Sequence, residues 1–247
     1  MKECLRGRTP AAFRARSGFT LVELLVAVAV IALLVGIVLP ALSRARQTAR
    51  ATVCLSRLYS LGQAMQMYVD ANDGRFPTVG FAHGGLSDET TAWINVAAAE
   101  IGSAAVTRCP TDQSRHWTEP LPGTDRLRQL SYATNYYTTG SVVGREEYVV
   151  ATRIPRPATT IFWVELAEDG NYAAADHVHP ETWFANPRTL ATREVQLERH
   201  SGRANYGLID GHVEAMKFEA TYQIDRANTQ FPRIAWTRNK YDPAAGW

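Results

Sequence analysis

The most unusual acidic side chain in this sequence is that of Glu23, because it lies within an otherwise apolar stretch. Residues 24–39 contain no polar side chain, and residues 19–42 are apolar apart from Thr20, Glu23 and Pro40. A carboxylate in a membrane helix costs about 2.5–3.5 kcal/mol even on a lenient insertion scale. In a plain signal peptide or membrane anchor, nothing would compensate for that cost. Glu23 therefore indicates a functional role. The alternative is that its carboxylate only snorkels to the membrane interface.

Histidine and aspartate side chains in the second half of the chain form a candidate metal-binding set. The set comprises His177, His179, His200, His212, Asp176 and Asp210. Its spacing matches no common zinc motif, since the chain has neither H-E-x-x-H nor C-x-x-C. We therefore expect no bound metal, and we expect His200 to pack or hydrogen-bond against the turn at Asp210.

The sequence lacks the motifs of common catalytic sites. It contains no G-x-S-x-G nucleophile elbow, no phosphate-binding loop and no dinucleotide fingerprint. Glu165 and Glu168 are two nearby acids, which we interpret as a solvated strand end in preference to a catalytic dyad. We predict that the protein is not an enzyme and needs no cofactor.

Composition describes a globular protein with an exceptional N-terminal end. The chain has 247 residues, of which 46% are hydrophobic and 20% charged, and this argues against a disordered, collagen-like or coiled-coil protein. A mean hydropathy of −0.20 is too polar for several membrane crossings. The net charge of +2 excludes a strongly basic nucleic-acid binder. Residues 1–18 carry five basic side chains and one acidic side chain, so the rest of the chain is slightly acidic.

A single long helix is expected to position Glu23. A helix over residues 19–42 rises about 36 Å, which is enough to cross a hydrocarbon core of about 30 Å. Residues 43–74 predict an amphipathic continuation that ends in the turn at residues 70–74, whose spacing does not fit a calcium loop. The apolar side of this second half has residues spaced by three and four: Ala51, Cys54, Leu58, Leu61, Met65 and Tyr68.

Residues 75–247 predict a soluble domain of α+β class with more strand than helix. The expected elements are a helix over residues 87–101, a strand over 160–166, and a two-residue hairpin at Asp210-Gly211 between strands 205–209 and 212–218. The segments 103–130 and 167–200 are rich in Pro, Gly, Thr and Asp, and we expect long surface loops there.

The start of the apolar run carries a family resemblance. Gly18-Phe19-Thr20-Leu21-Val22-Glu23, after a basic leader of residues 1–18, resembles the processing site of type IV prepilins and of the pseudopilins of type II secretion. The resemblance implies that a prepilin peptidase cuts after Gly18 and methylates the new amine of Phe19. It also implies that Glu23 neutralises the Phe19 amine of a neighbouring subunit, which sets the register of the filament. Pro40 matches a helix-bending proline of many family members.

The resemblance extends less closely into the soluble domain. Nine residues separate His200 from Asp210-Gly211, which is similar to the H-x9-D-G signature of a large bacterial group of pseudopilin-like proteins. Further segments resemble that group, namely residues 54–58, 74–77, 108–112 and 131–135, together with Tyr68. The signature supports membership and implies no chemistry. Major pseudopilins bind calcium in a C-terminal acidic loop, which Asp242-Pro243 does not reproduce.

The cysteines have two interpretations. Cys4 lies in the leader and is lost on processing, which leaves Cys54 and Cys109 in a domain expected to face an oxidising compartment. A disulfide would fasten a loop to the long helix and contribute about 2–4 kcal/mol. Two separate buried thiols are the alternative.

Together these features predict a pseudopilin-like structural subunit of a short periplasmic filament, in a type II secretion or type IV pilus-like system. Its partners would be the prepilin peptidase, other pseudopilin subunits and the bacterial inner membrane, with no nucleic acid. The chain would cross that membrane once, with its N-terminus cytoplasmic and residues 75–247 periplasmic. The alternatives are a membrane-tethered binding module that captures a polymer or exported cargo, a tethered metal hydrolase, and an ordinary exported protein with a signal peptide or anchor.

Overall fold

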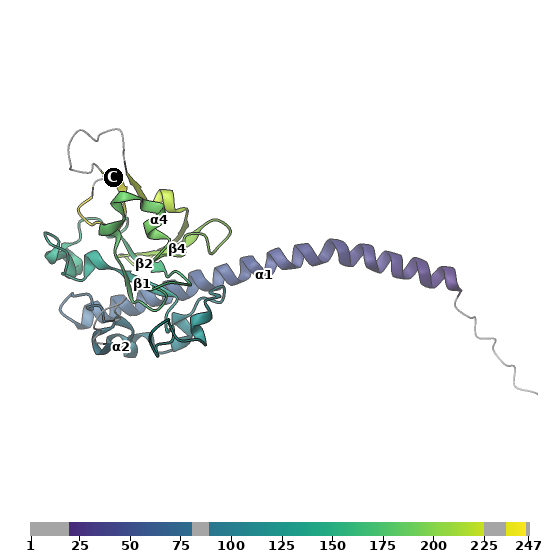
Figure 1. Cartoon of the computed structure of the whole chain (residues 1–247), viewed down its shortest axis with the longest axis horizontal. Coiled ribbons are helices and arrows are strands. Elements are labelled where there is room, and N and C mark those ends of the chain that lie inside the picture. Colours follow the sequence, from purple (N-terminus) through teal and green to yellow (C-terminus); the bar gives the residue numbers. More distant parts are fainter. Residues whose placement is uncertain (1–19, 81–88, 225–235, 246–247) are drawn as a thin grey trace, which may run out of the picture. The chain divides into compact units, whose positions relative to one another are not determined.

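The computed structural model of the chain describes residues 20–80, 89–224 and 236–245. A long helix, α1, spans Leu21–Ala71, and a mixed β-sheet follows it in the chain (Figure 1). This confirms the α+β class. The chain divides into two compact units, residues 1–45 and residues 46–247, so that α1 contributes to both.

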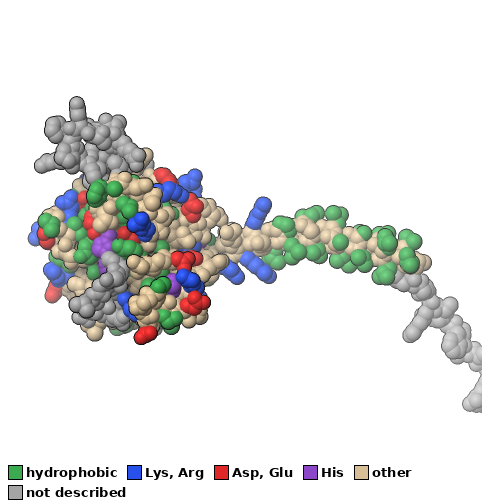
Figure 2. Space-filling model, in the orientation of Figure 1, with side chains coloured by type: hydrophobic (Ala, Val, Ile, Leu, Met, Phe, Trp, Pro, Cys, Tyr) green, Lys and Arg blue, Asp and Glu red, His purple; other side chains and the backbone are tan. Residues whose placement is uncertain are grey.

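The described part of the first unit is the beginning of α1. Its large apolar side chains are exposed, from 41% for Leu42 to 79% for Leu21, and Figure 2 shows them along the helix. By length and composition α1 can cross a membrane. Pro40 lies inside α1, which continues on both sides of it. Because proline has no N–H, the helical hydrogen bond to Gly36 is missing, and a bend at this point stays a prediction.

The second half of α1 packs into the domain through one side. The buried residues are Cys54, Leu58, Leu61, Gly62, Ala64, Met65 and Val69. This confirms the predicted apolar side for its central positions, whereas Ala51 and Tyr68 at its ends are only half-buried. The helix ends as expected: Gly74 adopts a φ of 74° and donates its N–H to the carbonyl of Val69.

The domain is built on a five-stranded sheet with the order β3-β1-β2-β4-β5. Its strands are β1 (Tyr132–Asn135), β2 (Ile161–Glu165), β3 (His177–Val178), β4 (Ala204–Leu208) and β5 (Val213–Met216). All pairings are antiparallel except that of β1 with β3. Every residue of β1, β2 and β4 is buried, so both faces of the central strands are covered. A separate antiparallel pair joins β6 (Tyr222–Ile224) to β7 (Trp236–Asn239).

The hairpin at Asp210 and Gly211 forms with a longer loop than predicted. Gly207 pairs with Val213, and Leu208 donates its N–H to the carbonyl of His212. Three residues therefore lie in the loop instead of two. Gly211 has a φ of 90°, a conformation that favours glycine at the end of such a loop.

The remaining described segments form short helices. The helix predicted over residues 87–101 is broken, from residue 89 onward, into η1 (Glu89–Thr91), α2 (Trp93–Val96) and α3 (Ala98–Ile101), and Ser87 and Asp88 lie outside the described residues. The others are η2 (Ala104–Thr107), η3 (Arg115–Trp117), η4 (Tyr136–Thr138), η5 (Glu146–Val149), η6 (Ala151–Arg153), η7 (Pro180–Ala185), α4 (Pro187–Ala191) and η8 (Phe218–Ala220).

The expectation of surface loops over residues 103–130 and 167–200 is only partly correct, because most of their residues are exposed or half-buried but several are buried in the domain. These segments bury side chains that include Asp112, Arg128, Asp176, Trp183 and Glu194. The buried polar side chains among them make hydrogen bonds inside the domain, because buried polar groups must find partners there.

Candidate functional site

The beginning of α1 holds Glu23 in a capping box. The Glu23 carboxylate accepts hydrogen bonds of 2.8 Å from both the backbone N–H and the hydroxyl of Thr20. In return, the Glu23 N–H donates to the Thr20 hydroxyl oxygen at 3.2 Å. Thr20 thus acts as the N-cap and Glu23 as the third helical residue. Gly18 and Phe19, the two residues of the predicted cleavage site, lie outside the described residues.

A disulfide joins the buried side of α1 to the loop that contains Cys109. Cys54 on α1 is bonded to Cys109, 55 residues further along the chain. Both cysteines are fully buried. The Cys109 N–H donates to the Ser131 hydroxyl at 2.8 Å, and Tyr132 donates its hydroxyl to the carbonyl of Cys54 at 3.0 Å. The segments 108–112 and 131–135 therefore meet at α1.

A buried ion pair forms between Arg128 and Asp112, which follows Cys109 by three residues. Two nitrogens of Arg128 contact one oxygen of Asp112, at 2.6 and 3.0 Å, and the Ser131 hydroxyl donates to the same oxygen at 2.6 Å. Burial raises the pKa of Asp112, but Arg128 and Arg199 outweigh it and hold that pKa below its usual value of 3.8. Burial lowers the pKa of Arg128 to about 10, against the opposing effect of Asp112. Both groups are therefore charged at neutral pH.

Glu165 and His200 form a second buried pair beside the disulfide. The Nε2 atom of His200 lies 2.8 Å from Oε1 of Glu165, and the Asn205 N–H donates to Oε2 at 3.0 Å. Arg199 bridges the two pairs, because its guanidinium lies 3.9 Å from Glu165 and 3.7 Å from Asp112. The interpretation of Glu165 as a solvated strand end is wrong, because its side chain is fully buried, whereas Glu168 is half-buried.

The predicted contact between His200 and the Asp210 turn is also wrong. His200 pairs with Glu165, and Asp210 instead contacts His212, with 2.6 Å between its Oδ1 and Nδ1 of His212. The two ends of the H-x9-D-G signature nevertheless face the same helix. His200 lines a pocket with residues 47–55 of α1, and Gly211 lies against Gly62. The two ends of the signature thus lie on either side of β4, with His200 at the pocket beside α1 and Gly211 against Gly62.

The candidate metal-binding histidines and aspartates do not converge on one site in the described residues. Only one group of three or more potential ligand residues converges among the described residues, and it comprises Cys54, Cys109, Glu165 and His200. The two sulfurs of this group are bonded to each other. His177 and His179 have ring centroids 4.7 Å apart, and each is engaged by a neighbouring acid, Asp176 or Glu181. The four candidate histidines therefore do not form one site.

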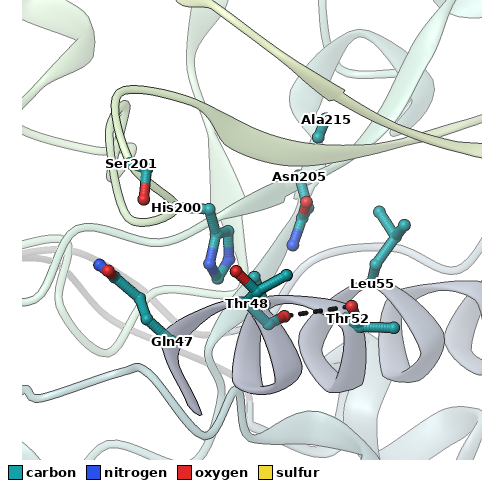
Figure 3. Close-up of a pocket in the computed structure, with 9 residues that line it drawn as sticks. Gln47, Thr48, Thr52, Leu55, His200, Ser201, Asn205 and Ala215 are labelled. Carbon is teal, nitrogen blue, oxygen red and sulfur yellow. Dashed lines mark hydrogen bonds between the residues drawn. The ribbon is translucent and has the colours of Figure 1, made fainter. Parts of the chain in front are cut away.

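A pocket of about 310 Å³ opens between α1 and the β4–β5 region. It is lined by Gln47, Thr48, Ala51, Thr52, Leu55, His200, Ser201, Asn205 and Ala215. In Figure 3 the side chains of His200 and Asn205 point from the sheet side towards the helix. His200 is 8% exposed and Asn205 is 2% exposed.

Comparison with known proteins gives a match for the N-terminal segment. The profile of the prokaryotic N-terminal methylation motif matches residues 13–39. No curated protein and no solved structure gives a significant match to the chain. The motif and the long apolar helix after it are consistent with a type IV prepilin-like protein, and the motif implies processing by a prepilin peptidase.

Sequence reasoning missed three parts of this arrangement. The spacing of Thr20 and Glu23 fits the capping-box pattern and was a readable signal. The ion pair of Asp112 and Arg128 had no such signal, because the two residues are separated by 16 positions in an irregular segment. Nor does anything local in the sequence mark Glu165 as the partner of His200, 35 residues away.

Proposed function

We propose that this chain is a prepilin-like structural subunit that is cut after Gly18, methylated at Phe19 and assembled through its N-terminal helices into a short filament. The observation that carries the proposal is the methylation motif at residues 13–39, which leads directly into an apolar helix with Glu23 in its first turn. Cleavage before this helix would leave the membrane anchor on the mature protein. The filament would belong to a type II secretion or type IV pilus-like system.

The acid in the first turn supports assembly by electrostatic pairing. Helices packed in an apolar filament core penalise an unpaired charge, so Glu23 needs a positive partner there. The amine released at Phe19 would be such a partner, supplied by a neighbouring subunit. In the isolated chain the same carboxylate is satisfied by Thr20. Assembly would therefore exchange a capping interaction for an ion pair between subunits.

The folded domain supports a structural role outside the membrane. Its disulfide suits an oxidising compartment, which agrees with a single-pass protein whose domain is periplasmic and whose leader is cytoplasmic. The described residues of the domain are organised around α1, through the disulfide, the Cys54 carbonyl and the Gly62–Gly211 contact. Such a domain would move as one body with residues 46–71 of α1 when the subunit enters a filament.

The intact mass and N-terminal sequence of the mature protein, isolated from membranes, test the proposal. We expect a chain that starts with N-methyl-Phe19. A chain that starts near Ser43 or Arg44 would contradict it, since an exported protein that sheds its apolar helix cannot assemble through that helix. The Gly18→Ala variant provides the matched control. It changes the residue before the proposed cut and leaves the apolar helix unchanged.

A further inference from the structure

Four potential ligand atoms for a metal ion converge at the disulfide. They belong to Cys54, Cys109, Glu165 and His200, and they all lie within 4.8 Å of one another. All four residues are buried. In the oxidised chain the two sulfurs are bonded to each other and are not available to an ion. Reduction of that bond would make two thiolates available beside one imidazole and one carboxylate.

The set matches the ligands and the geometry that zinc prefers. Structural zinc takes four ligands in a tetrahedron, with Zn–S distances of about 2.3 Å and Zn–N or Zn–O distances of about 2.0–2.2 Å. Two sulfurs on one ion are then roughly 3.8 Å apart, and a nitrogen and an oxygen roughly 3.3 Å apart. Nε2 of His200 already lies 2.8 Å from Oε1 of Glu165, and no pair in the set is separated by more than 4.8 Å. Side-chain shifts of roughly 1 Å would therefore complete the tetrahedron once the sulfurs can separate.

Neighbouring groups hold the four side chains in place. The Thr111 hydroxyl lies 2.9 Å from the nearer sulfur and 3.5 Å from the other, where it can donate to a thiolate. The Asn205 N–H donates to Oε2 of Glu165, which leaves Oε1 on the side of His200. Nδ1 of His200 has no hydrogen-bond partner among the described residues. Coordination through either ring nitrogen would therefore disrupt only the contact with Glu165.

The buried charges around the set favour a neutral complex. The carboxylates of Asp112 and Glu165 are matched by the guanidinium groups of Arg128 and Arg199, and all four side chains are almost completely buried. Their charges sum to zero. A Zn²⁺ ion with two thiolates is also neutral, so its binding would leave no uncompensated charge in the interior.

Metal uptake has to accompany folding. Cys54 and Cys109 are both 0% exposed, so an ion in solution cannot reach their sulfurs in the folded domain. Structural zinc sites are closed in this way, and their ligands come together only as the chain folds around the metal. Because every disulfide is made from two thiols, a reduced chain that folds before oxidation would meet the metal first.

We propose that Cys54, Cys109, Glu165 and His200 bind one Zn²⁺ ion in the reduced chain, and that formation of the disulfide releases it. The two zinc-bound thiolates pass two electrons to an external disulfide as the Cys54–Cys109 bond forms. The external disulfide takes up two protons and leaves as two thiols, and Zn²⁺ goes into solution. Reduction by an external dithiol is the reverse exchange and releases two protons when the zinc binds. The four ligands lie within residues 46–247, so this chemistry does not depend on cleavage after Gly18.

The zinc content of the two redox states tests this proposal. The full chain carries Cys4→Ser, so that no third thiol competes, and is refolded into detergent with equimolar zinc and either a phosphine reductant or a disulfide oxidant. After loosely bound metal is removed on a chelating resin, we expect one zinc ion per reduced chain and none per oxidised chain. Oxidation of the loaded protein should release its zinc.

X-ray absorption at the zinc edge identifies the ligands. The reduced, loaded protein should show two sulfur neighbours at about 2.3 Å and two nitrogen or oxygen neighbours at about 2.0–2.2 Å. The imidazole of His200 should contribute its characteristic outer-shell scattering.

Variants connect the metal to this set of residues. His200→Gln removes one ligand and should raise the Kd for zinc by roughly 100-fold in the reduced chain. His212→Gln, at an exposed histidine that contacts Asp210, is the matched control and should leave the Kd unchanged. Cys54→Ala/Cys109→Ala should bind no zinc. The disulfide forms without the metal, so thermal unfolding of oxidised His200→Gln shows separately whether that variant folds.

A reduced chain that contains no zinc after refolding would overturn the proposal. Zinc without two sulfur neighbours, or zinc bound equally well by a folded His200→Gln variant, would also overturn it, since the ion would then lie elsewhere. Zinc that stays bound after complete oxidation would contradict its release. If oxidised His200→Gln does not fold, the imidazole scattering of the wild-type protein decides whether His200 is a ligand, and its absence would count against the site.

Discussion

Gly62 on α1 lies directly against Gly211 in the loop between β4 and β5, so that a Cβ atom on Gly62 would be 3.3 Å from the Gly211 carbonyl oxygen. The hairpin loop therefore touches the helix backbone to backbone. This contact, two helical turns beyond the Cys54 disulfide, explains why glycine is placed in the middle of a helix, where it costs about 1 kcal/mol relative to alanine.

Substitutions at Gly62 should show opposing effects of helix propensity and crowding. Gly62→Ala should be close to neutral, because a gain of about 1 kcal/mol in propensity offsets the tight contact with Gly211. Gly62→Leu should lower the free energy of unfolding by about 1–3 kcal/mol, because the larger side chain must displace the hairpin loop. Chemical denaturation measures both, with Gln66→Leu at an exposed position of the same helix as control. A neutral Gly62→Leu variant would show that the loop is free to move.

Two substitutions of Glu23 should separate helix capping from subunit docking. Glu23→Gln keeps a side chain that can complete the capping box with Thr20, but it removes the charge. Glu23→Ala removes both functions. We expect both variants to lose filament incorporation by at least tenfold, measured by cross-linking in membranes.

The capping effect should appear only in the alanine variant. Circular dichroism of the monomer in detergent should show a frayed helix start for Glu23→Ala and not for Glu23→Gln. Normal assembly of Glu23→Gln would contradict the charge-pairing proposal and would assign Glu23 to capping alone.

Reduction should loosen the domain through the bond between Cys54 and Cys109. The disulfide closes a segment of 55 residues and should contribute about 2–4 kcal/mol to the free energy of unfolding. Thermal unfolding with and without reductant measures this contribution. The Cys54→Ala/Cys109→Ala double variant should be as unstable as the reduced protein and should not respond to reductant.

Alkylation gives a direct check of the same bond. The mature protein should stay unlabelled until it is reduced, and it should then take up two labels. The measurement needs processed protein or a Cys4→Ser background, because Cys4 in the leader would be labelled in either state. Labelling of both cysteines without reductant would show that the thiols are free.

Asp112→Asn should destabilise the domain strongly. The substitution leaves Arg128 buried without its countercharge, and loss of one partner of a buried pair costs about 3–5 kcal/mol. Urea unfolding at pH 7 should detect this change. Asp169→Asn, at an exposed acid that contacts Arg115, provides the control and should have little effect.

The same residue should contribute to acid sensitivity. The pKa of Asp112 is held below 3.8 in the folded protein, so its contribution is present above that value and is lost as the pH falls through the folded pKa. The wild type should therefore lose stability below about pH 4, and the Asn variant should show a smaller loss over that range. Equal acid dependence of the two proteins would show that other carboxylates control the transition.

The sequence alone determined the long N-terminal helix of this protein. The apolar run, the position of Glu23 and the glycine-phenylalanine junction are local features, and a helix in lipid needs only local hydrogen bonds and apolar side chains. The spacing of Cys54, Leu58, Leu61 and Met65 likewise predicted which side of the second half is buried, because helical periodicity follows directly from residue order.

Only the tertiary structure decided the polar interior of the domain. The partners in its close contacts are not sequence neighbours: Asp112 and Arg128 are separated by 16 positions, Glu165 and His200 by 35, and Gly62 and Gly211 by about 150. Charged residues in Pro- and Gly-rich segments are normally solvated, and burial reverses that preference only when a partner arrives from elsewhere. The contact partner of each such residue is therefore a property of the fold and not of its sequence neighbours.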